Sequence, residues 1–269
     1  NASCKLKERN MNKDYFTEWR LNQDSFTSRF EKICSDFDID DPSKVQFHSQ
    51  QDEDKYIIQF ILKKKITNGV FLEIGACDGI LYSNTKTLED YFGFSGILIE
   101  PQNHFYERLT VNRPNCDNFN VAVSSKPEEY VVFHGLGAEG GIKETLNIRK
   151  KSKYKLKSIF SMLKSFFQHT KRSFKVKNLR MSEVLKQSRF DYVDIMIIDV
   201  EGGELDLLKS IDFTFPIFCI FIEAHSHQKE KNEKFHQFLI KKGFNFIERQ
   251  RGNEVWINPN YFRKDLFNL

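Results

Sequence analysis

Residues 70–79 read VFLEIGACDG and combine a mostly apolar run, which contains one acid, Glu73, with a glycine-rich turn. Such a run is typical of a strand that is buried on both faces of a parallel sheet. Similar runs lie at residues 97–100 (ILIE), 194–199 (DIMIID) and 218–223 (FCIFIE). The segments between these runs have helical spacing. The sequence therefore predicts an α/β fold with a mostly parallel central sheet and helices on both faces.

The finer pattern predicts the remaining elements. Helices are expected over residues 83–92, 103–112, 204–210 and 235–242, and over 183–187 with Ser182 as the cap. Further strands are expected over 119–123 and 130–133, and an antiparallel hairpin over 244–248 and 254–257.

Acidic residues mark the ends of the predicted strands. Glu73, Glu100, Asp199 and Glu223 all fall there. In open parallel sheets a ligand lies beyond the carboxyl ends of the strands. We therefore expect the functional site at this edge of the sheet.

The glycine-rich turn favours one class of cofactor. It departs from the dinucleotide pattern GxGxxG, because Cys77 and Ile80 stand at the third and sixth positions. Gly75 and Gly79 still let the backbone approach a ligand closely. Glu100, at the end of the next strand, is suited to accept the hydroxyls of a ribose. A glycine-rich loop without phosphate chemistry and a ribose-binding acid together favour S-adenosylmethionine over NAD or FAD.

Five motifs follow one another along the chain. They are residues 49–54 (SQQDED), 71–79 (FLEIGACDG), 83–85 with 88–89 (SNT and LE), 96–101 (GILIEP) and 198–204 (IDVEGGE). In this order the sequence resembles the FkbM-type methyltransferases, which are S-adenosylmethionine-dependent O-methyltransferases with a Rossmann-like class I fold. The resemblance covers residues from about His48 to Ile257 and implies a methyltransferase domain over residues 46–269.

The resemblance implies a set of cofactor-binding residues. They are Glu73, Gly75, Ala76, Asp78, Gly79, Ser83, Asn84, Glu100, Pro101, Ala122 and Val123. Gly75, Ala76 and Gly79 would approach the methionine part, with Asp78 in contact directly or through water. Ser83 and Asn84 would bind its carboxylate at a helix start, although Ser83 suits a simple helix cap equally well. Ala122 and Val123 would flank the adenine.

Methyl transfer to a hydroxyl requires alignment and removal of a proton. The candidate catalytic residues are Asp199, Glu201, Glu223 and His225. Alternation places Glu223, His225 and His227 on one face of an extended segment, although His227 is also a plausible loop residue. Asp199, Glu223 and His225 are candidate ligands for Mg2+, without a diagnostic spacing. Glu204 fits better as an acid in the first turn of a helix.

The expected acceptor is a sugar hydroxyl of a surface glycan or of a glycosylated metabolite. The sugar is implied by the resemblance, since a fold does not fix a substrate. Two alternatives stay open: an enzyme of the same fold that acts on a lipid, polyketide or nitrogen acceptor, and a methyltransferase-like binding or scaffold protein without turnover. Glu73, Gly75, Glu100 and Asp199 are all present, which argues against the scaffold.

Residues 1–45 are expected to form a helical N-terminal extension. Phe26, Phe30, Ile33 and Phe37 recur at helical spacing. They predict an apolar stripe that packs on the main domain.

A basic helical insert is expected at about residues 140–177. Residues 143–177 hold 12 lysines and arginines and one acid, whereas the whole chain has a net charge of +4. Within them Leu156, Ile159, Phe160, Leu163 and Phe167 predict a basic amphipathic helix. Such a helix can pack on the domain, close over the site as a lid, or bind a membrane surface. Contact with nucleic acid is the least favoured use.

The cysteines suit a reducing compartment. Cys4, Cys34, Cys77, Cys116 and Cys219 are odd in number and form no CxxC pair. No run of 18 apolar residues occurs, so a cytoplasmic enzyme is expected, with membrane-surface association through the insert as an alternative. A removed upstream signal or anchor and the oligomeric state are left open.

Overall fold

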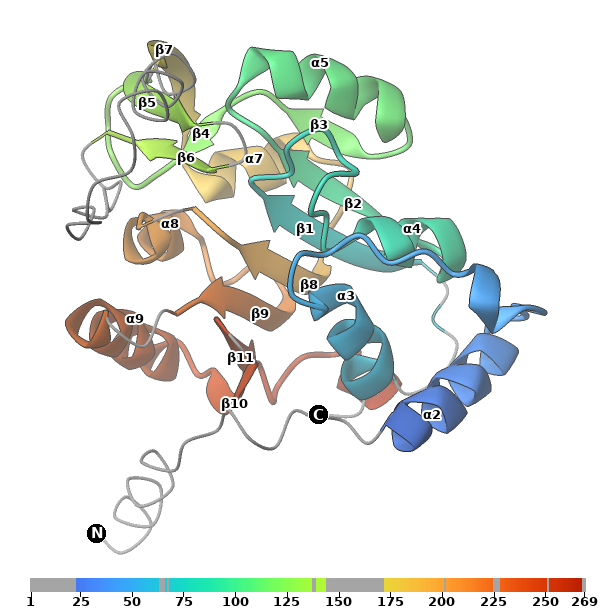
Figure 1. Ribbon diagram of the computed structural model, residues 1–269. Helices are drawn as coiled ribbons and strands as arrows, with labels where there is room; N and C mark the ends of the chain where they lie inside the picture. Colours follow the sequence, from blue (N-terminus) through green and yellow to red (C-terminus); the bar gives the residue numbers. More distant parts are fainter. Residues whose placement is uncertain are drawn as a thin grey trace, which may run out of the picture.

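The computed structural model describes residues 23–62, 66, 68–136, 139–143, 172–200, 202–224, 228–250 and 252–267. Within them a seven-stranded sheet has the order β10-β11-β9-β8-β1-β2-β3 (Figure 1). These strands are β1 (Gly69–Ile74), β2 (Phe94–Ile99), β3 (Asp117–Phe119), β8 (Val193–Ile198), β9 (Ile217–Glu223), β10 (Asn245–Gln250) and β11 (Asn253–Ile257). The pairs from β3 to β9 are parallel, and β11 is antiparallel to both β9 and β10. The mostly parallel sheet and its C-terminal hairpin are thus confirmed.

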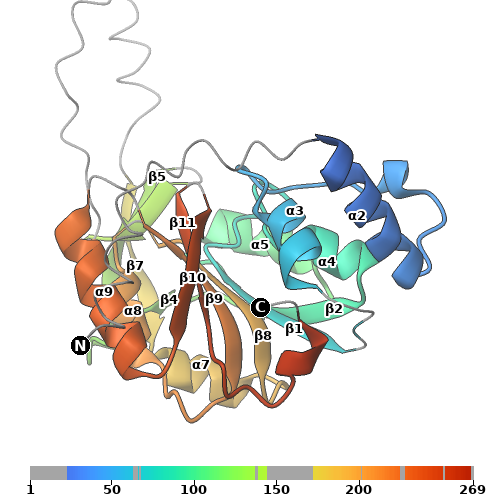
Figure 2. The same ribbon diagram turned by 90° about the horizontal axis from the view of Figure 1, so that it is seen from below.

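Helices cover both faces of this sheet (Figure 2). One face carries α2 (Gln23–Asp36), α3 (Glu53–Tyr56), the π-helix η2 (Ile57–Ile61), α4 (Lys86–Tyr91) and α5 (Asn103–Asn112). The other carries α7 (Met181–Gln187), α8 (Glu204–Ser210) and α9 (Lys229–Lys241). Alternate residues of β1 serve the two faces, since Phe71 belongs to the first core, and Val70 and Leu72 belong to the second.

The N-terminal helix packs on the first of these cores. Phe30 and Ile33 of α2 and Phe37, which follows it, are buried there, as the stripe predicted, and the side chain of Phe26 lies outside the description. The rings of Phe37 and Phe92 meet edge to face with centroids 5.0 Å apart.

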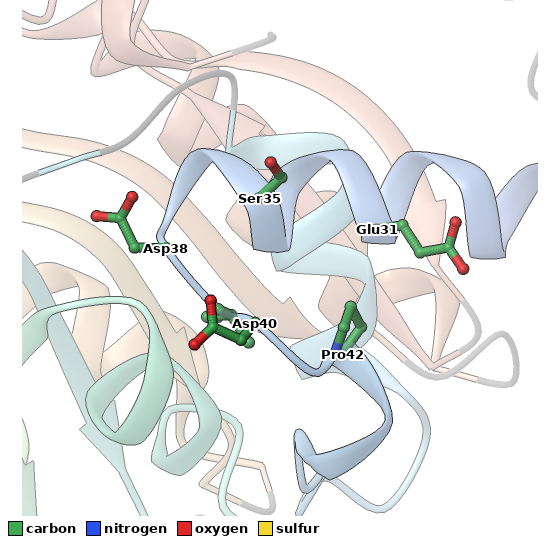
Figure 3. A pocket seen from close by; sticks show the side chains of 6 residues that line it. Glu31, Ser35, Asp38, Asp40 and Pro42 are labelled. Carbon is green, nitrogen blue, oxygen red and sulfur yellow. The ribbon is translucent and has the colours of Figure 1, made fainter.

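A surface depression lies where α2 gives way to the short 3-10 helix η1 (Pro42–Lys44) (Figure 3). It is lined by Glu31, Ser35, Asp38, Ile39, Asp40 and Pro42. None of these is a candidate site residue, and the lining belongs to α2 and the turn after it.

A second, four-stranded sheet was not predicted. Its order is β4 (Ala122–Val123), β7 (Arg172–Leu179), β5 (Tyr130–Leu136) and β6 (Glu139–Ile142). We call it the small sheet; in Figure 1 it lies on the side where the arrows of β1 and β9 end. Ala122, Val131, Phe133, Ile142 and Val176 form its own core.

The small sheet corrects two predictions. The single strand over 119–123 is wrong: β3 ends at Phe119 in the large sheet, and β4 begins at Ala122 in the small one. Asn120 makes the break, because its side-chain amide turns back to the carbonyl of Glu100 at 2.9 Å. The prediction of a helical insert at about residues 140–177 is wrong at both ends, because β6 and the first part of β7 lie there. The apolar stripe at 156–167 lies outside the described residues.

Several helix boundaries also differ. The helices α5 and α8 have the predicted bounds, but α4 begins at Lys86 rather than at Ser83. The helix α7 begins at Met181, so Ser182 lies inside it and is not its cap. The helix α9 begins at Lys229, six residues before the predicted start, because its first turns are polar and show no apolar periodicity.

Two further findings concern the cysteines and the membrane. Cys34, Cys77, Cys116 and Cys219 are buried free thiols, and Cys4 lies outside the description. No helix among the described residues is long and apolar enough to cross a membrane.

Candidate functional site

The glycine-rich loop is fixed between the ends of two strands. The N–H groups of Gly75 and Ala76 both donate to the carbonyl of Ile99, at 2.9 and 3.1 Å. Gly75 has φ +85°, and a Cβ there would lie 2.9 Å from the carbonyl oxygen of Asp199. A side chain at position 75 would therefore push the loop away from the end of β8. The ends of β1, β2 and β8 meet at this point, as the strand pattern predicted.

Glu100 is the buried acid of this edge. It is 2% exposed, and its Oε2 accepts the N–H of Cys77 at 3.0 Å while Oε1 accepts that of Gln102 at 2.7 Å. Burial raises the pKa of Glu100 to about 7, and these hydrogen bonds offset the effect only in part. A ligand that brings hydroxyl groups to such a buried carboxylate would favour its ionised form further.

Cys77 adopts an unusual backbone conformation to make this contact. Its φ is +49°, in the left-handed region that costs a residue with a Cβ about 1–3 kcal/mol. Its thiol is buried, and burial raises the pKa of the thiol to about 12. The loop therefore uses the backbone N–H of Cys77, and its sulfur stays protonated.

Asp78 and Gly79 complete the loop. The side chain of Asp78 accepts the N–H groups of Ile80 and Leu81, at 3.1 and 2.8 Å, so it turns back on its own loop. Gly79 has φ +82°, and a Cβ there would come within 2.6 Å of the Cγ of Arg113. The second glycine thus makes room for a buried arginine.

Glu73 forms a network with the segment before α4. Its Oε2 accepts hydrogen bonds from the hydroxyls of Ser83 and Thr85, at 2.9 and 2.6 Å, and its Oε1 accepts the N–H of Asn84 at 2.7 Å. Ser83 Oγ in turn accepts the N–H of Lys86 at 3.1 Å, but the N-cap residue of α4 is Thr85, so Ser83 is not the helix cap that the sequence offered. Ser83 and Asn84 precede α4 rather than belonging to its first turn.

Arg113 joins this network and was missed by the sequence analysis. It is fully buried, pairs with Glu89, and donates through Nη1 to the carbonyl of Gly79 at 3.0 Å. Further donations reach Ser83 Oγ at 3.3 Å and Thr85 Oγ1 at 3.2 Å. Its partners lie about 30 residues earlier in the chain, so no local pattern marks it.

The predicted adenine-flanking residues lie on the small sheet. Ala122 and Val123 are buried in β4 and pair with Asn178 and Leu179 of β7. Pro101 is half-buried, and its carbonyl accepts the side-chain amide of Asn120 at 3.3 Å. The segment after Glu100 therefore connects the large sheet with the small one.

The candidate catalytic acids lie at the ends of neighbouring strands. Ile198 and Ile222 are paired in the parallel ladder of β8 and β9, so Asp199 and Glu223 follow in the same register. Asp199 is exposed and Glu223 is half-buried. Glu201, His225 and His227 lie outside the described residues. Among the residues that are described, no group of three His, Cys, Asp or Glu side chains could hold a metal ion.

Glu204, the last acid of the 198–204 motif, joins the segment after β8 to α9. It is fully buried; its Oε1 accepts the N–H of Gly202 at 3.0 Å, and its Oε2 lies 2.7 Å from Lys231 Nζ. The predicted dipole role at the start of α8 is thus accompanied by an ion pair that the sequence did not reveal.

The N-terminal motif reaches the same edge of the sheet. Ser49 forms a β-bridge with Tyr82 of the glycine-rich loop. Glu53, which is buried, accepts the side-chain amide of Asn253 at 3.0 Å, and Asn253 pairs with Glu223. The chain thus brings three distant segments together around the strand ends.

The sequence matches one family, described as the methyltransferase FkbM domain, over residues 73–250. No curated protein matches the chain.

Several solved structures are similar in fold. An FkbM methyltransferase from Methylobacillus flagellatus has 8% identity and a TM-score of 0.41, covering 87% of this chain and 59% of its own. A TehB-like S-adenosylmethionine-dependent methyltransferase from Corynebacterium glutamicum has 7% identity and a TM-score of 0.40, covering 87% and 97%. Fibrillarin from Aeropyrum pernix, solved with S-adenosyl-L-methionine, has 10% identity and a TM-score of 0.38, covering 72% and 68%.

Proposed function

Because this chain belongs to the FkbM methyltransferase family, we propose that it transfers the methyl group of S-adenosylmethionine to a hydroxyl oxygen, on a sugar of a glycan or of a glycosylated metabolite. The observation that carries the cofactor assignment is Glu100, a buried carboxylate at the end of β2 with only protein N–H donors beside it. The sugar follows from the family, and the carboxylates at the strand ends are compatible with a hydroxyl acceptor.

The residues fit the cofactor by their donor and acceptor chemistry. A carboxylate has about four lone-pair sites; in Glu100 the backbone N–H groups of Cys77 and Gln102 occupy two of them, and the side chain of Gln102 makes a third hydrogen bond. Acceptor capacity is left for the hydroxyls of a ribose. Gly75, next to Glu100 in space, is exposed, which suits the close approach of a ligand to the loop.

The cofactor supplies an activated methyl group when it is bound. The protein binds and orients the cofactor. Glu100 orients the ribose, and the loop at 75–79 holds the rest of the cofactor between the ends of β1 and β8. Alignment of the acceptor oxygen with the methyl group accounts for much of the rate in such a displacement. The acceptor proton then goes to a carboxylate, for which Asp199 and Glu223 are placed on adjacent strands. Glu201 and His225 remain candidates for the same role.

The test is a calorimetric titration with S-adenosylmethionine and S-adenosylhomocysteine, each with and without Mg2+. We expect micromolar binding, and we expect Glu100→Ala to weaken it about 10- to 150-fold, as for lost hydrogen bonds to a charged group. Unchanged affinity in the variant would remove Glu100 from the cofactor site. A signal that requires Mg2+ would promote Asp199, Glu223 and His225 to metal ligands.

A second stage identifies the acceptor. Cofactor labelled in its methyl group is offered with free sugars, glycolipids, polyketides and amines. Transfer to a sugar hydroxyl supports the proposal, and transfer to another class replaces that part of it. Tight cofactor binding without transfer to any acceptor would favour a binding or scaffold protein.

A further inference from the structure

Gly135 of the small sheet lies against Gln102. A Cβ at position 135 would lie 2.5 Å from Gln102 Oε1 and 3.3 Å from its Cδ, so a side chain there would force the Gln102 amide to shift. Gln102 is only 5% exposed, so its amide has little room to move away. The glycine is therefore what allows the small sheet to approach this side chain.

Gln102 in turn holds the carboxylate of Glu100. Its N–H donates to Glu100 Oε1 at 2.7 Å, and its side chain makes a further hydrogen bond with the same carboxylate, which lowers the pKa of Glu100 against the effect of burial. Asn120, just before β4, donates to the carbonyl of Glu100 at 2.9 Å. The short turn after β2 thus contacts both the carboxylate of Glu100 and residues of the small sheet.

The small sheet has a core of its own, although Val123 and Leu179 pack with the large sheet. The rings of Phe133 and Phe174 are tilted across β5 and β7 with centroids 5.5 Å apart, and Phe174 Cε1 would be 3.4 Å from a Cβ at Gly135. Gly135 pairs with Gly140 of β6 and with Arg172 of β7. The position of Gln102 consequently depends on how this unit sits against the large sheet.

We propose that Gln102 is a positioning residue for Glu100, and that Gly135 places it, so that recognition of the cofactor ribose depends on the small sheet. The inference rests on the proposed function, because it specifies how that cofactor is held.

A double-mutant cycle tests the pair. The affinity for S-adenosylhomocysteine is measured at about pH 8 for the wild type, Gln102→Ala, Gly135→Ala and the double variant. Each single substitution is expected to weaken binding about tenfold or more, in the range of a lost hydrogen bond to a charged group. The double variant is expected to bind no worse than Gln102→Ala, because alanine at 135 then has no amide to displace.

Gly140→Ala is the matched control. Gly140 is the cross-strand partner of Gly135, but a Cβ there would meet the ring of Phe133 at 2.8 Å and leave Gln102 untouched. It should lower the melting temperature and leave the affinity near that of the wild type. An equal loss of affinity in Gly140→Ala would mean that any damage to the small sheet has the same effect. It would refute the proposal that Gly135 acts specifically by placing Gln102.

A second readout does not depend on the cofactor. The titration of the Glu100 carboxyl, followed by carbon-13 NMR in the cofactor-free protein, should move to higher pH in Gln102→Ala and in Gly135→Ala. The Cys77 thiol also interacts with this carboxyl, but its raised pKa of about 12 keeps it neutral. The backbone donors are unchanged in both variants.

The outcomes separate the two proposals. If the wild type fails to bind S-adenosylhomocysteine, the proposed function fails, and the NMR titration decides the positioning role on its own. If the wild type binds and the single variants bind equally well, or if their effects multiply in the double variant, the positioning role is refuted. An unmoved titration of Glu100 in Gln102→Ala refutes it as well.

Discussion

Replacing Glu100 by glutamine should change how the stability of the cofactor-free protein depends on pH. Burial raises the pKa of this carboxyl from 4.5 to about 7, so the folded protein keeps a proton that the unfolded chain has already released. Between these two values unfolding releases that proton, and the wild type loses stability as the pH rises. Below about pH 4.5 the contribution is fully present, and above about pH 7 it is gone.

The magnitude follows from the same shift. At about 1.4 kcal/mol per pKa unit, the rise from 4.5 to about 7 corresponds to about 3 kcal/mol. The substituted amide cannot titrate, so the stability of the wild type minus that of Glu100→Gln should fall by about 3 kcal/mol between about pH 4 and pH 8. A glutamine accepts through only one oxygen and therefore loses one of the two backbone donors. That cost is the same at every pH and does not enter the slope.

The assay is urea unfolding of both proteins in steps of pH. If the difference in stability between the wild type and Glu100→Gln does not change with pH, or increases as the pH rises, the raised pKa of Glu100 is refuted. Adding S-adenosylhomocysteine extends the test, because ribose hydroxyls prefer the ionised form. The affinity of the wild type should therefore rise with pH up to about 7 and then level off. The affinity of Glu100→Gln should not follow this curve.

Three further predictions concern other parts of the site. Asp199→Asn should abolish methyl transfer, measured with labelled cofactor, while the affinity for S-adenosylhomocysteine stays within about threefold of the wild type; near-normal turnover would remove Asp199 from the catalytic residues. Arg113→Met should lower the free energy of unfolding by about 3–5 kcal/mol, since it removes the buried partner of the half-buried Glu89 and the hydrogen bonds to Gly79, Ser83 and Thr85. The exposed Arg108→Met should lower it by less than about 1 kcal/mol, and equal effects on urea unfolding would contradict this account of Arg113. Gly75→Ala should cost about 1–2 kcal/mol of stability, because φ is +85° there, and should weaken cofactor binding in calorimetry; wild-type affinity would argue against a fixed loop.

The large sheet was predictable because its strands are buried on both faces. The runs around Phe71, Ile97 and Met196 are apolar without interruption, and only a covered parallel strand tolerates that pattern. The acids at the ends of these runs were therefore correctly expected at one edge of the sheet, because parallel strands end at the same edge. Ile74 pairs with both Ile99 and Ile198, which fixes that edge.

The small sheet was missed although the sequence carries a signal for β7. Residues 172–179 read RSFKVKNL, in which Phe174 and Val176 alternate with charged or polar residues. This period of two residues predicts a strand with one buried face and one solvent-exposed face. These residues were assigned to the basic helical insert because of their many positive charges, and a count of charges does not take the spacing of the apolar residues into account. Arg113 left no comparable signal, because its partners come from a loop that is distant in sequence.

Motif residues of one chemical type have different roles here, and the segment that supplies the donors around each distinguishes these roles. Glu73 receives two hydroxyls and one N–H from the segment before α4, so its carboxylate is used to hold the loop. Asp78 is used in the same way by its own turn. Glu100 also has three donors, the N–H groups of Cys77 and Gln102 and the side chain of Gln102, but they offset the cost of its burial only in part, and its pKa stays raised. A ligand that brings hydroxyl groups to this carboxylate favours its ionised form. A motif specifies the acid but not the donors around it, which is why all three were predicted as cofactor-binding residues, whereas Glu73 and Asp78 hold the loop.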